Sequence, residues 1–204
     1  MSSPASHEPP AAGDIRAGAP AQPAPAPPRR RRSRRVLVEW VVILGIAVLA
    51  AFLVRTFVVE PFFIPSGSME PTLQVNDRIL VNKLSYDLHA VHRGDIVVFH
   101  KLPSDVSPGI TDLVKRVIGL PNETISAHDG SIYIDGHKLA EPWLPKGVTT
   151  APFGPVHIPK GDYFMMGDNR GDSSDSRVFG PVPGKLFVGR AFVRVWPLSR
   201  IGGL

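Results

Sequence analysis

Two serines, one residue apart, are the hydroxyls best placed to act as a nucleophile in this chain. Ser66 and Ser68 flank Gly67 within the segment 65–73, which reads Pro-Ser-Gly-Ser-Met-Glu-Pro-Thr-Leu. The two prolines each fix φ and lack an N–H, so neither a continuous helix nor a central strand fits here. The glycine opens backbone conformations that a Cβ would forbid. We therefore expect a stiff, non-repetitive loop that holds two hydroxyls in defined positions.

A serine hydroxyl attacks a carbonyl efficiently only when a base takes its proton. A Ser-His-Asp triad stays open because its members meet in space, although the sequence has no G-x-S-x-G elbow. A Ser-x-x-Lys pair is excluded, since no lysine has a serine three residues before it. The remaining arrangement pairs the serine with a distant lysine. Lys115, within the apolar segment 113–120, has the most apolar sequence neighbours of any lysine.

A lysine that acts as a base must be neutral at the working pH. The reference pKa of a lysine is about 10.4, and burial in apolar surroundings can lower it by several units. Strand alternation would place Lys115 on the same face as Leu113 and Val117. Taken alone, the segment favours an exposed strand lysine. Only its combination with the other segments points to a base.

A third segment concentrates turn formers, hydroxyls and opposite charges. Residues 167–177 read Gly-Asp-Asn-Arg-Gly-Asp-Ser-Ser-Asp-Ser-Arg. By itself this composition fits either a solvated loop or a calcium-binding loop. Its meaning becomes specific only beside the serine loop and the lysine segment.

The charge of the chain is concentrated at its N-terminus. Residues 1–35 contain seven arginines and two acidic residues, which accounts for the whole formal net charge of +5. The basic composition is therefore a property of this tail and gives no reason to expect nucleic acid as a partner. The chain has no cysteine, which excludes disulfides, thiol nucleophiles and thiolate metal sites. We expect neither a metal nor another cofactor.

Residues 36–59 form a long apolar run that is interrupted only by Glu39, Arg55 and Thr56. As a helix these residues would extend about 36 Å, enough to cross a hydrocarbon core of about 30 Å. A removable signal peptide is the alternative, but no clean polar cleavage region follows, so we expect a retained transmembrane helix. Residues 1–35, low in bulky apolar residues, are expected to be a disordered cytoplasmic tail. The arginine cluster Arg29–Arg35 on the N-terminal flank of this helix then places residues 60–204 outside the cell membrane.

The segment 60–204 has the pattern of a mainly β, antiparallel domain. Turn signals such as Asp129-Gly130 and Asp135-Gly136 separate short apolar stretches. The strongest hairpin prediction falls at Asp129-Gly130, and no stretch of ten residues shows helical periodicity. The apolar stretches are 78–82, 95–99, 113–120, 124–127, 131–134, 163–166 and 186–196.

Taken together, the three segments resemble those of bacterial type I signal peptidases (leader peptidases), the membrane-bound Ser/Lys proteases of protein export in the S26 family. The resemblance runs from about Val36 to the C-terminus. It is carried by PSGSMEPTL at 65–73, RGDIVVF at 93–99, KRVIGLP at 115–121, GDNRGDSSDSR at 167–177 and VGRAFVRVWP at 188–197.

The resemblance implies a role for individual residues. Ser68 would be the nucleophile and Lys115 the general base, while Ser66 would contribute its hydroxyl to the oxyanion hole. Ser173 would hydrogen-bond and orient the lysine amine. Further matched positions are Phe62, Ile64, Met69 and Val114, which would shape shallow apolar pockets, and Asp168, Asp175 and Arg177, of which the last two would form a structural ion pair. Glu70 and the pair Gly171-Asp172 depart from the commoner family residues, which leaves loop detail open.

The same resemblance implies exported preproteins as substrates, cut after small residues at A-x-A-like sites. The lipid bilayer would be a second partner, and the enzyme would work close to the secretion translocon. Two alternatives stay open at this stage. One is a self-cleaving repressor of related fold, which would lack the apolar run and carry a DNA-binding module. The other is a non-catalytic β domain tethered to the membrane.

Overall fold

The computed structural model describes residues 32–103, 109 and 111–204. Of the predicted disordered tail 1–35, residues 1–31 lie outside the described residues, whereas residues 32–35 belong to the first helix. The chain divides into two compact units, 1–43 and 44–204, with the division inside the first helix. This helix, α1, covers Arg32–Phe57, so it begins before the predicted span 36–59 and ends two residues earlier.

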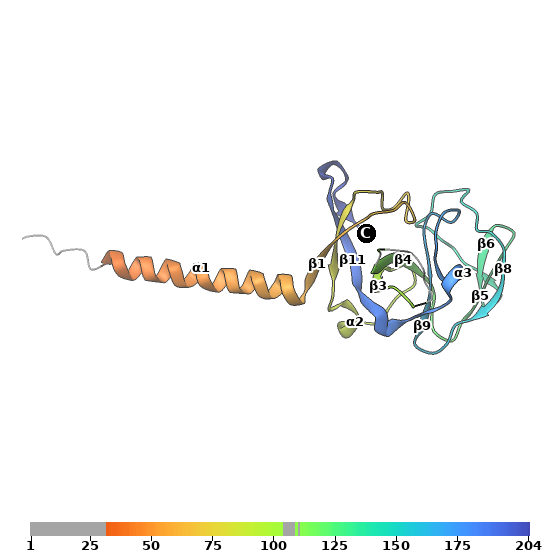
Figure 1. Cartoon of the computed structure of the whole chain (residues 1–204), viewed down its shortest axis with the longest axis horizontal. Coiled ribbons are helices and arrows are strands. Elements are labelled where there is room, and N and C mark those ends of the chain that lie inside the picture. Colours follow the sequence, from red (N-terminus) through yellow and green to blue (C-terminus); the bar gives the residue numbers. More distant parts are fainter. Residues whose placement is uncertain (1–31, 104–108, 110) are drawn as a thin grey trace, which may run out of the picture. The chain divides into compact units, whose positions relative to one another are not determined.

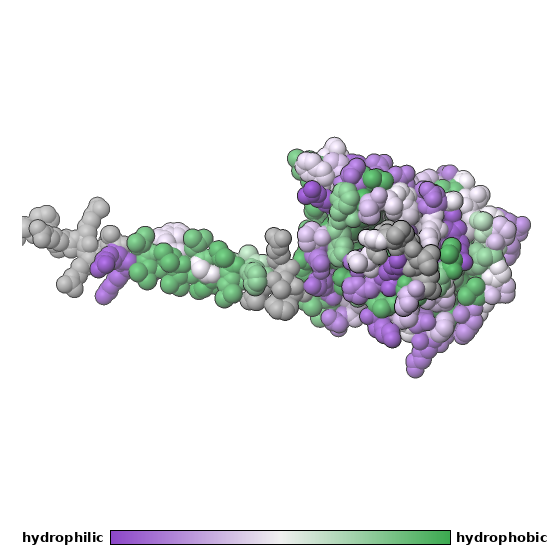
Figure 2. Space-filling view, viewed as in Figure 1, coloured by the Kyte–Doolittle hydropathy of each residue, from purple (hydrophilic) through white to green (hydrophobic). Residues whose placement is uncertain are grey.

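Helix α1 is long and apolar enough to cross a membrane. Its window Arg34–Phe52 has 19 residues and a mean hydropathy of 2.2. Figure 2 shows a nearly continuous apolar surface along it, and side chains such as Trp40 and Leu49 are exposed. A helix of this composition is suited to a lipid environment. Pro61 disfavours helical geometry in the residue before it, and Val59 instead begins a strand.

Within the described residues, the strands form one eight-stranded and one four-stranded sheet, and every pairing is antiparallel. The larger sheet contains, in spatial order, β1 (Val59–Phe63), β2 (Arg78–Asn82), β11 (Phe187–Trp196), β3 (Ile96–His100), β4 (Asp112–Gly119), β9 (Asp162–Met166) and β10 (Val182–Pro183), with β12 (Gly202–Gly203) paired to β11. The smaller sheet has the order β7 (His137–Lys138), β6 (Ser131–Ile134), β5 (Thr124–His128) and β8 (Phe153–His157) (Figure 1). The remaining elements are short: α2 (Ser85–Leu88), α3 (Ser176–Phe179) and the 3₁₀ turns η1 (Gly184–Leu186) and η2 (Leu198–Arg200).

The predicted fold class, a mainly β antiparallel domain, is confirmed. Each predicted apolar stretch is a strand whose ends differ by no more than one residue from the prediction. The hairpin at Asp129-Gly130 is also present: His128 pairs with Ser131, and the two turn residues have φ of 50° and 72°. Positive φ at both central positions is what the tight turn between twisted strands requires.

The sequence reading missed the two-residue strands β7, β10 and β12. It also missed β1 and β8, and each of these contains a residue that argues against a strand. Pro61 lies within β1, and Gly154-Pro155 lie within β8. Both strands are at the edge of their sheet, where a missing N–H costs no ladder bond. In β8 the pairing with β5 also has a register shift between Ile125 and Ala127, next to the glycine and proline.

The loop between β1 and β2 is anchored on the core by its own apolar residues. Ile64, Met69 and Leu73 are buried in a cluster with residues of β2 and β3, and Val114 of β4 packs against the same cluster. A well-packed core tolerates little displacement of such side chains. Residues 64–73, which include both serines, are therefore held over the middle of the larger sheet.

A buried carboxylate holds the C-terminal end of this loop, just before β2. Asp77 is 1% exposed and forms an ion pair with Arg200 at 2.9 Å. Its other oxygen accepts the Gln74 N–H at 2.8 Å, and Arg194 Nη1 donates to the Thr72 carbonyl at 2.7 Å. Strand β11 and the turn η2 after it thus add polar anchors to the apolar ones of this loop.

Candidate active site

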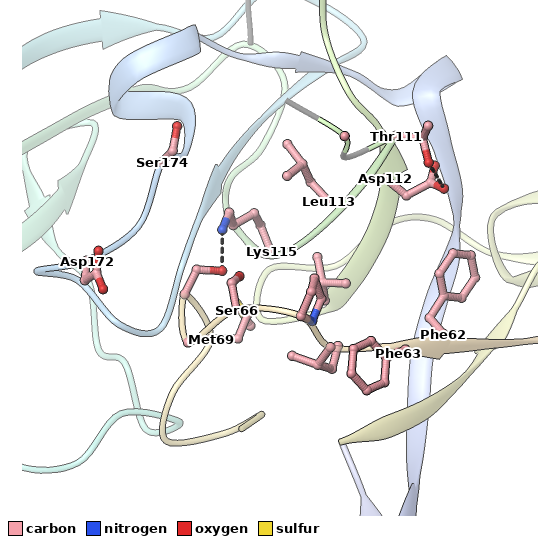
Figure 3. Close-up of a pocket in the computed structure, with 16 residues that line it drawn as sticks. Phe62, Phe63, Ser66, Met69, Thr111, Asp112, Leu113, Lys115, Asp172 and Ser174 are labelled. Atoms are coloured by element: carbon pink, nitrogen blue, oxygen red, sulfur yellow. Dashed lines mark hydrogen bonds between the residues drawn. The ribbon is translucent and has the colours of Figure 1, made fainter. Parts of the chain in front are cut away.

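The structure brings Lys115 to Ser68. The Nζ atom of Lys115 lies 2.6 Å from the Ser68 Oγ, within hydrogen-bond distance (Figure 3). Lys115 is only 3% exposed, which excludes the alternative of an exposed strand lysine. It lies in the middle of β4, opposite Val97 of β3. A buried strand and a core-anchored loop therefore fix the two groups relative to each other.

A cavity of about 510 Å³ opens beside this pair. Ser66, Ser68 and Lys115 line it, together with residues from β1, the serine loop and β4. All four side chains that sequence reasoning assigned to substrate pockets contribute to its wall: Phe62, Ile64, Met69 and Val114. Ile64 and Met69 are almost fully buried, so they form part of the cavity floor.

The peptide units around Ser68 are hydrogen-bonded on their carbonyl sides. The Gly67 carbonyl accepts the Glu70 N–H at 3.0 Å and the Asn169 Nδ2 at 3.1 Å. The Ser68 carbonyl accepts the Asn169 N–H at 3.2 Å. Among the described residues the Ser68 N–H has no hydrogen-bond partner. Beside the exposed Ser66, it is a donor available to a ligand in the cavity.

Ser173 lies beside the serine loop but does not line this cavity. A Cβ placed on Gly167 would collide with both the Ser173 Oγ and the Ser68 carbonyl, so the three residues are closely packed. The Ser173 Oγ is buried and makes no hydrogen bond with the described residues. Its role in orienting Lys115 therefore stays a prediction.

Three ion pairs hold the segment 167–177, and the first joins Asp168 to Arg116. Asp168 accepts two hydrogen bonds from Arg116, at 2.6 and 2.8 Å, and a third from the Thr72 hydroxyl at 2.5 Å. Bidentate pairs of this kind fix geometry as well as charge. Arg116 directly follows the candidate base, so the same ion pair connects β4, the serine loop and the end of β9.

The second pair lies within the segment itself. Asp175 and Arg177 are 2.7 Å apart, and the buried Asp175 carboxylate also accepts the Gly167 N–H at 3.0 Å. Asp175 caps the short helix α3 by accepting the Arg177 N–H. The predicted structural residues Asp168, Asp175 and Arg177 thus lie behind the cavity rather than in its wall.

Sequence reasoning missed several residues around the site. Phe63, Leu113 and Asp172 line the cavity, and Asn169 and Arg116 hold its walls. Leu113 could have been found as the strand neighbour of Val114, which was predicted. Arg116 carried a signal too, because a charge within an apolar strand requires a partner. The Asn169 contact joins residues 102 positions apart, and no local pattern indicates it.

Two phenols outside the cavity have raised pKa values. Burial raises the pKa of Tyr163, and burial together with the Asp95 carboxylate raises the pKa of Tyr86. Both phenols therefore stay neutral in the physiological range. Across the part of the chain that the structure describes, no group of three or more His, Asp or Glu side chains is arranged to hold a metal ion.

A buried amine against a serine hydroxyl, on a β domain and beside an open cavity, defines a serine hydrolase with a lysine in place of the usual histidine base. The sequence profile of one such family, described as "Signal peptidase, peptidase S26", matches residues 37–196. The chain belongs to this signal peptidase family.

Individual relatives agree with this assignment. "Probable signal peptidase I-2" of Synechocystis sp. is 43% identical over 144 residues, covering 70% of this chain and 66% of that protein. "Signal peptidase I" of Leptolyngbya laminosa is 42% identical over 148 residues, covering 71% and 72%. A crystal structure of a signal peptidase I from Enterococcus faecalis V583 has 33% sequence identity and a TM-score of 0.42, covering 50% of this chain and 97% of that chain.

Proposed function

We propose that this protein is a type I signal peptidase, in which Ser68 is the nucleophile and Lys115 the general base. The observation that carries the proposal is the 2.6 Å distance between Nζ and Oγ, with the lysine almost fully buried. Removal of an amine from water disfavours its charged form. A neutral Lys115 can then accept the serine proton, which no other described lysine is placed to do.

The reaction proceeds in two halves. Ser68 Oγ attacks the scissile carbonyl carbon while Lys115 takes the hydroxyl proton, and the tetrahedral intermediate forms. The lysine returns this proton to the leaving nitrogen as the peptide bond breaks, which gives an acyl-enzyme and a released amine. A water molecule then attacks the ester carbonyl, with Lys115 again as the base, and Ser68 is regenerated.

Charge that develops on the carbonyl oxygen is stabilised by two donors. The Ser66 hydroxyl and the Ser68 N–H both belong to residues in the cavity wall. Because the Ser68 Oγ attacks the carbonyl carbon of the substrate, the backbone N–H of the same residue lies close to the carbonyl oxygen. Each such donor typically contributes about 3–4 kcal/mol to the transition state.

The shape of the cavity supports a preference for small side chains. Its floor of Ile64 and Met69 and its walls of Phe62 and Val114 are apolar and already close-packed. Overfilling such a site is costly, whereas an alanine-sized group fits without rearrangement. The substrates are exported preproteins, whose cleavage regions have small residues of the A-x-A kind.

Membrane anchoring keeps the site where these substrates emerge. Ten residues lie between Phe57, where α1 ends, and Ser68, which limits the distance between these two residues to about 40 Å. The arginine-rich flank of α1 favours a cytoplasmic N-terminus, with residues 60–204 outside. The bilayer and the region near the secretion translocon are therefore the proposed surroundings of the catalytic domain.

The test is cleavage of one preprotein by the full-length protein in detergent. Wild type should release the signal peptide at a single site that follows a small residue. Ser68→Ala should give no cleavage above the assay background, because no other group can form the ester. Equal activity of wild type and variant would refute the proposal, and so would the absence of cleavage by a folded wild-type protein across preproteins with A-x-A sites.

A further inference from the structure

Asn169 contacts the backbone on both sides of Ser68. Its Nδ2 donates to the Gly67 carbonyl at 3.1 Å, and its N–H donates to the Ser68 carbonyl at 3.2 Å. A carbonyl oxygen can only accept, so the NH₂ end of the side chain must face Gly67. One asparagine thus holds two successive peptide units of the serine loop.

The first of these peptide units contains the proposed oxyanion donor. A trans peptide is planar, and its N–H points away from its C=O. The Gly67 carbonyl accepts from the Asn169 Nδ2 at 3.1 Å and from the Glu70 N–H at 3.0 Å, and these bonds together set the direction of the Ser68 N–H, which has no partner among the described residues. Donation to the carbonyl also polarises the peptide unit and strengthens its N–H as a donor.

The neighbours of Asn169 hold it firmly. Asp168 and Arg170 are 1% and 4% exposed, and each is paired with a residue of another element. Asp168 binds Arg116 of β4. Arg170 binds Glu141 in the connection after β7, and its Nη1 also donates to the Thr150 hydroxyl at 2.9 Å.

These contacts of the two flanking residues fix the backbone position of Asn169. Any displacement of its backbone would disturb one of two buried ion pairs, and breaking such a pair is costly. Rigid support from surrounding groups is what keeps a catalytic donor within a fraction of an ångström of its working position. The side-chain amide can therefore impose an orientation on the serine loop instead of following it.

We propose that Asn169 is a positioning residue that orients the Ser68 N–H for the oxyanion of the substrate. The inference rests on the proposed function, which supplies the reaction. A purely structural role is the competing explanation. The loop has other anchors, however, since Ile64, Met69 and Leu73 are buried and Asp77 is ion-paired. Loss of one side-chain hydrogen bond should therefore leave the domain folded.

The experiment compares two substitutions in the full-length protein. Asn169→Asp keeps the size of the side chain but replaces its N–H donors with a carboxylate and so adds a negative charge, and Asn169→Ala removes the whole group without adding charge. Both should lower kcat for preprotein cleavage roughly 10- to 100-fold, less than deletion of a donor that touches the oxyanion. KM should change little, because the Ser68 N–H matters chiefly in the transition state.

Asn82→Ala is the matched control. Asn82 also makes one side-chain hydrogen bond to backbone, accepting the Leu84 N–H at 3.0 Å. It lies at the end of β2 that is remote from the serine loop. This variant should keep the wild-type kcat, whereas its loss of thermal stability should equal or exceed that of the Asn169 variants.

A peptide boronic acid provides a readout that a structural role would not change. Its tetrahedral adduct on Ser68 is negatively charged and places an oxygen where the oxyanion of the substrate forms. A non-cleavable peptide of the same sequence binds the same cavity without forming this charge. The Asn169 variants should lose affinity for the boronate by the same factor as kcat/KM and keep their affinity for the peptide.

The outcomes separate the inference from the proposed function. Wild-type kcat in Asn169→Asp, with Ser68→Ala inactive, would overturn the inference and leave the function standing. Equal losses of boronate and peptide affinity would also overturn it, because the residue would then only support the cavity. Cleavage by Ser68→Ala would instead refute the proposed function.

Discussion

Lys115 and Arg116 are neighbours on β4, yet the surroundings of Arg116 favour a cation and those of Lys115 favour a neutral amine. The Arg116 guanidinium meets the Asp168 carboxylate and the ring of Trp143, 5.3 Å from its centroid, and both favour a cation. The Lys115 amine meets the hydroxyl of Ser68 in a buried position. Alternation along the strand sends the two side chains to opposite faces, so one strand can supply both a structural cation and a candidate base.

At the same scale, the two serines should respond differently to the loss of their hydroxyls. Ser66 would only stabilise charge, so Ser66→Ala should retain activity with kcat reduced roughly 10²–10³-fold and KM little changed. Ser66→Thr, which keeps a hydroxyl, should recover part of the loss if the extra methyl fits. Measuring kcat and the melting temperature on the same preparation decides the role of Ser66. A normal kcat with a lowered melting temperature would mean that Ser66 only supports the loop.

At the scale of elements, the site is made where the end of β9 passes under the serine loop. Gly167 directly follows this strand, and its lack of a side chain allows the Ser68 carbonyl and Ser173 to approach. The turn that follows is held by ion pairs to β4 and to the connection before β8. The geometry of the nucleophile therefore depends on a segment about a hundred residues away in sequence.

This close packing leads to a prediction for two glycines. Gly167→Ala should strongly reduce kcat, because its Cβ would displace the Ser68 backbone or the Ser173 side chain. Gly154→Ala in β8 is the control, since a Cβ there meets nothing within 4 Å. Steady-state kinetics on both variants check this. Similar activity of the two proteins would show that the serine loop tolerates the added methyl group.

Sequence alone was sufficient for those features that are local. The serine loop, the Lys115 strand and the Asp129-Gly130 hairpin are each encoded within a few adjacent residues. The partners of Arg116, Asn169 and Arg170 could not be predicted, because they come from distant segments that only the folded sheet brings together. Strand β8 was missed for another reason: an edge position and a register shift allow residues that a central strand would exclude.

For the whole molecule, the chain couples an apolar helix to a β domain that carries the site. The helix is suited to a bilayer by length and composition. Of the seven arginines of residues 1–35, four precede the helix and three lie within its first four residues, and the rest of the chain has balanced charge. This asymmetry is the pattern that retains a flank on the cytoplasmic side.

The proposed orientation, with the N-terminus in the cytoplasm and residues 60–204 outside, can be tested with protease added to intact spheroplasts. Residues 60–204 should be digested, and an epitope tag at the N-terminus should stay protected until the membrane is opened. A cytoplasmic marker protein serves as the control for membrane integrity. Protection of the C-terminal domain together with loss of the tag would show the opposite orientation.

The assignment of Lys115 as the general base is tested most directly by the cleavage rate of Lys115→Arg. The guanidinium keeps the positive charge but does not give up its proton, so it cannot act as a base. We expect kcat/KM of this variant to fall to the background of Ser68→Ala, while the folded fraction stays comparable. In wild type, kcat/KM should fall as the pH is lowered, because protonated Lys115 cannot accept the serine proton. Substantial preprotein cleavage by Lys115→Arg would contradict the assignment of Lys115 as the base.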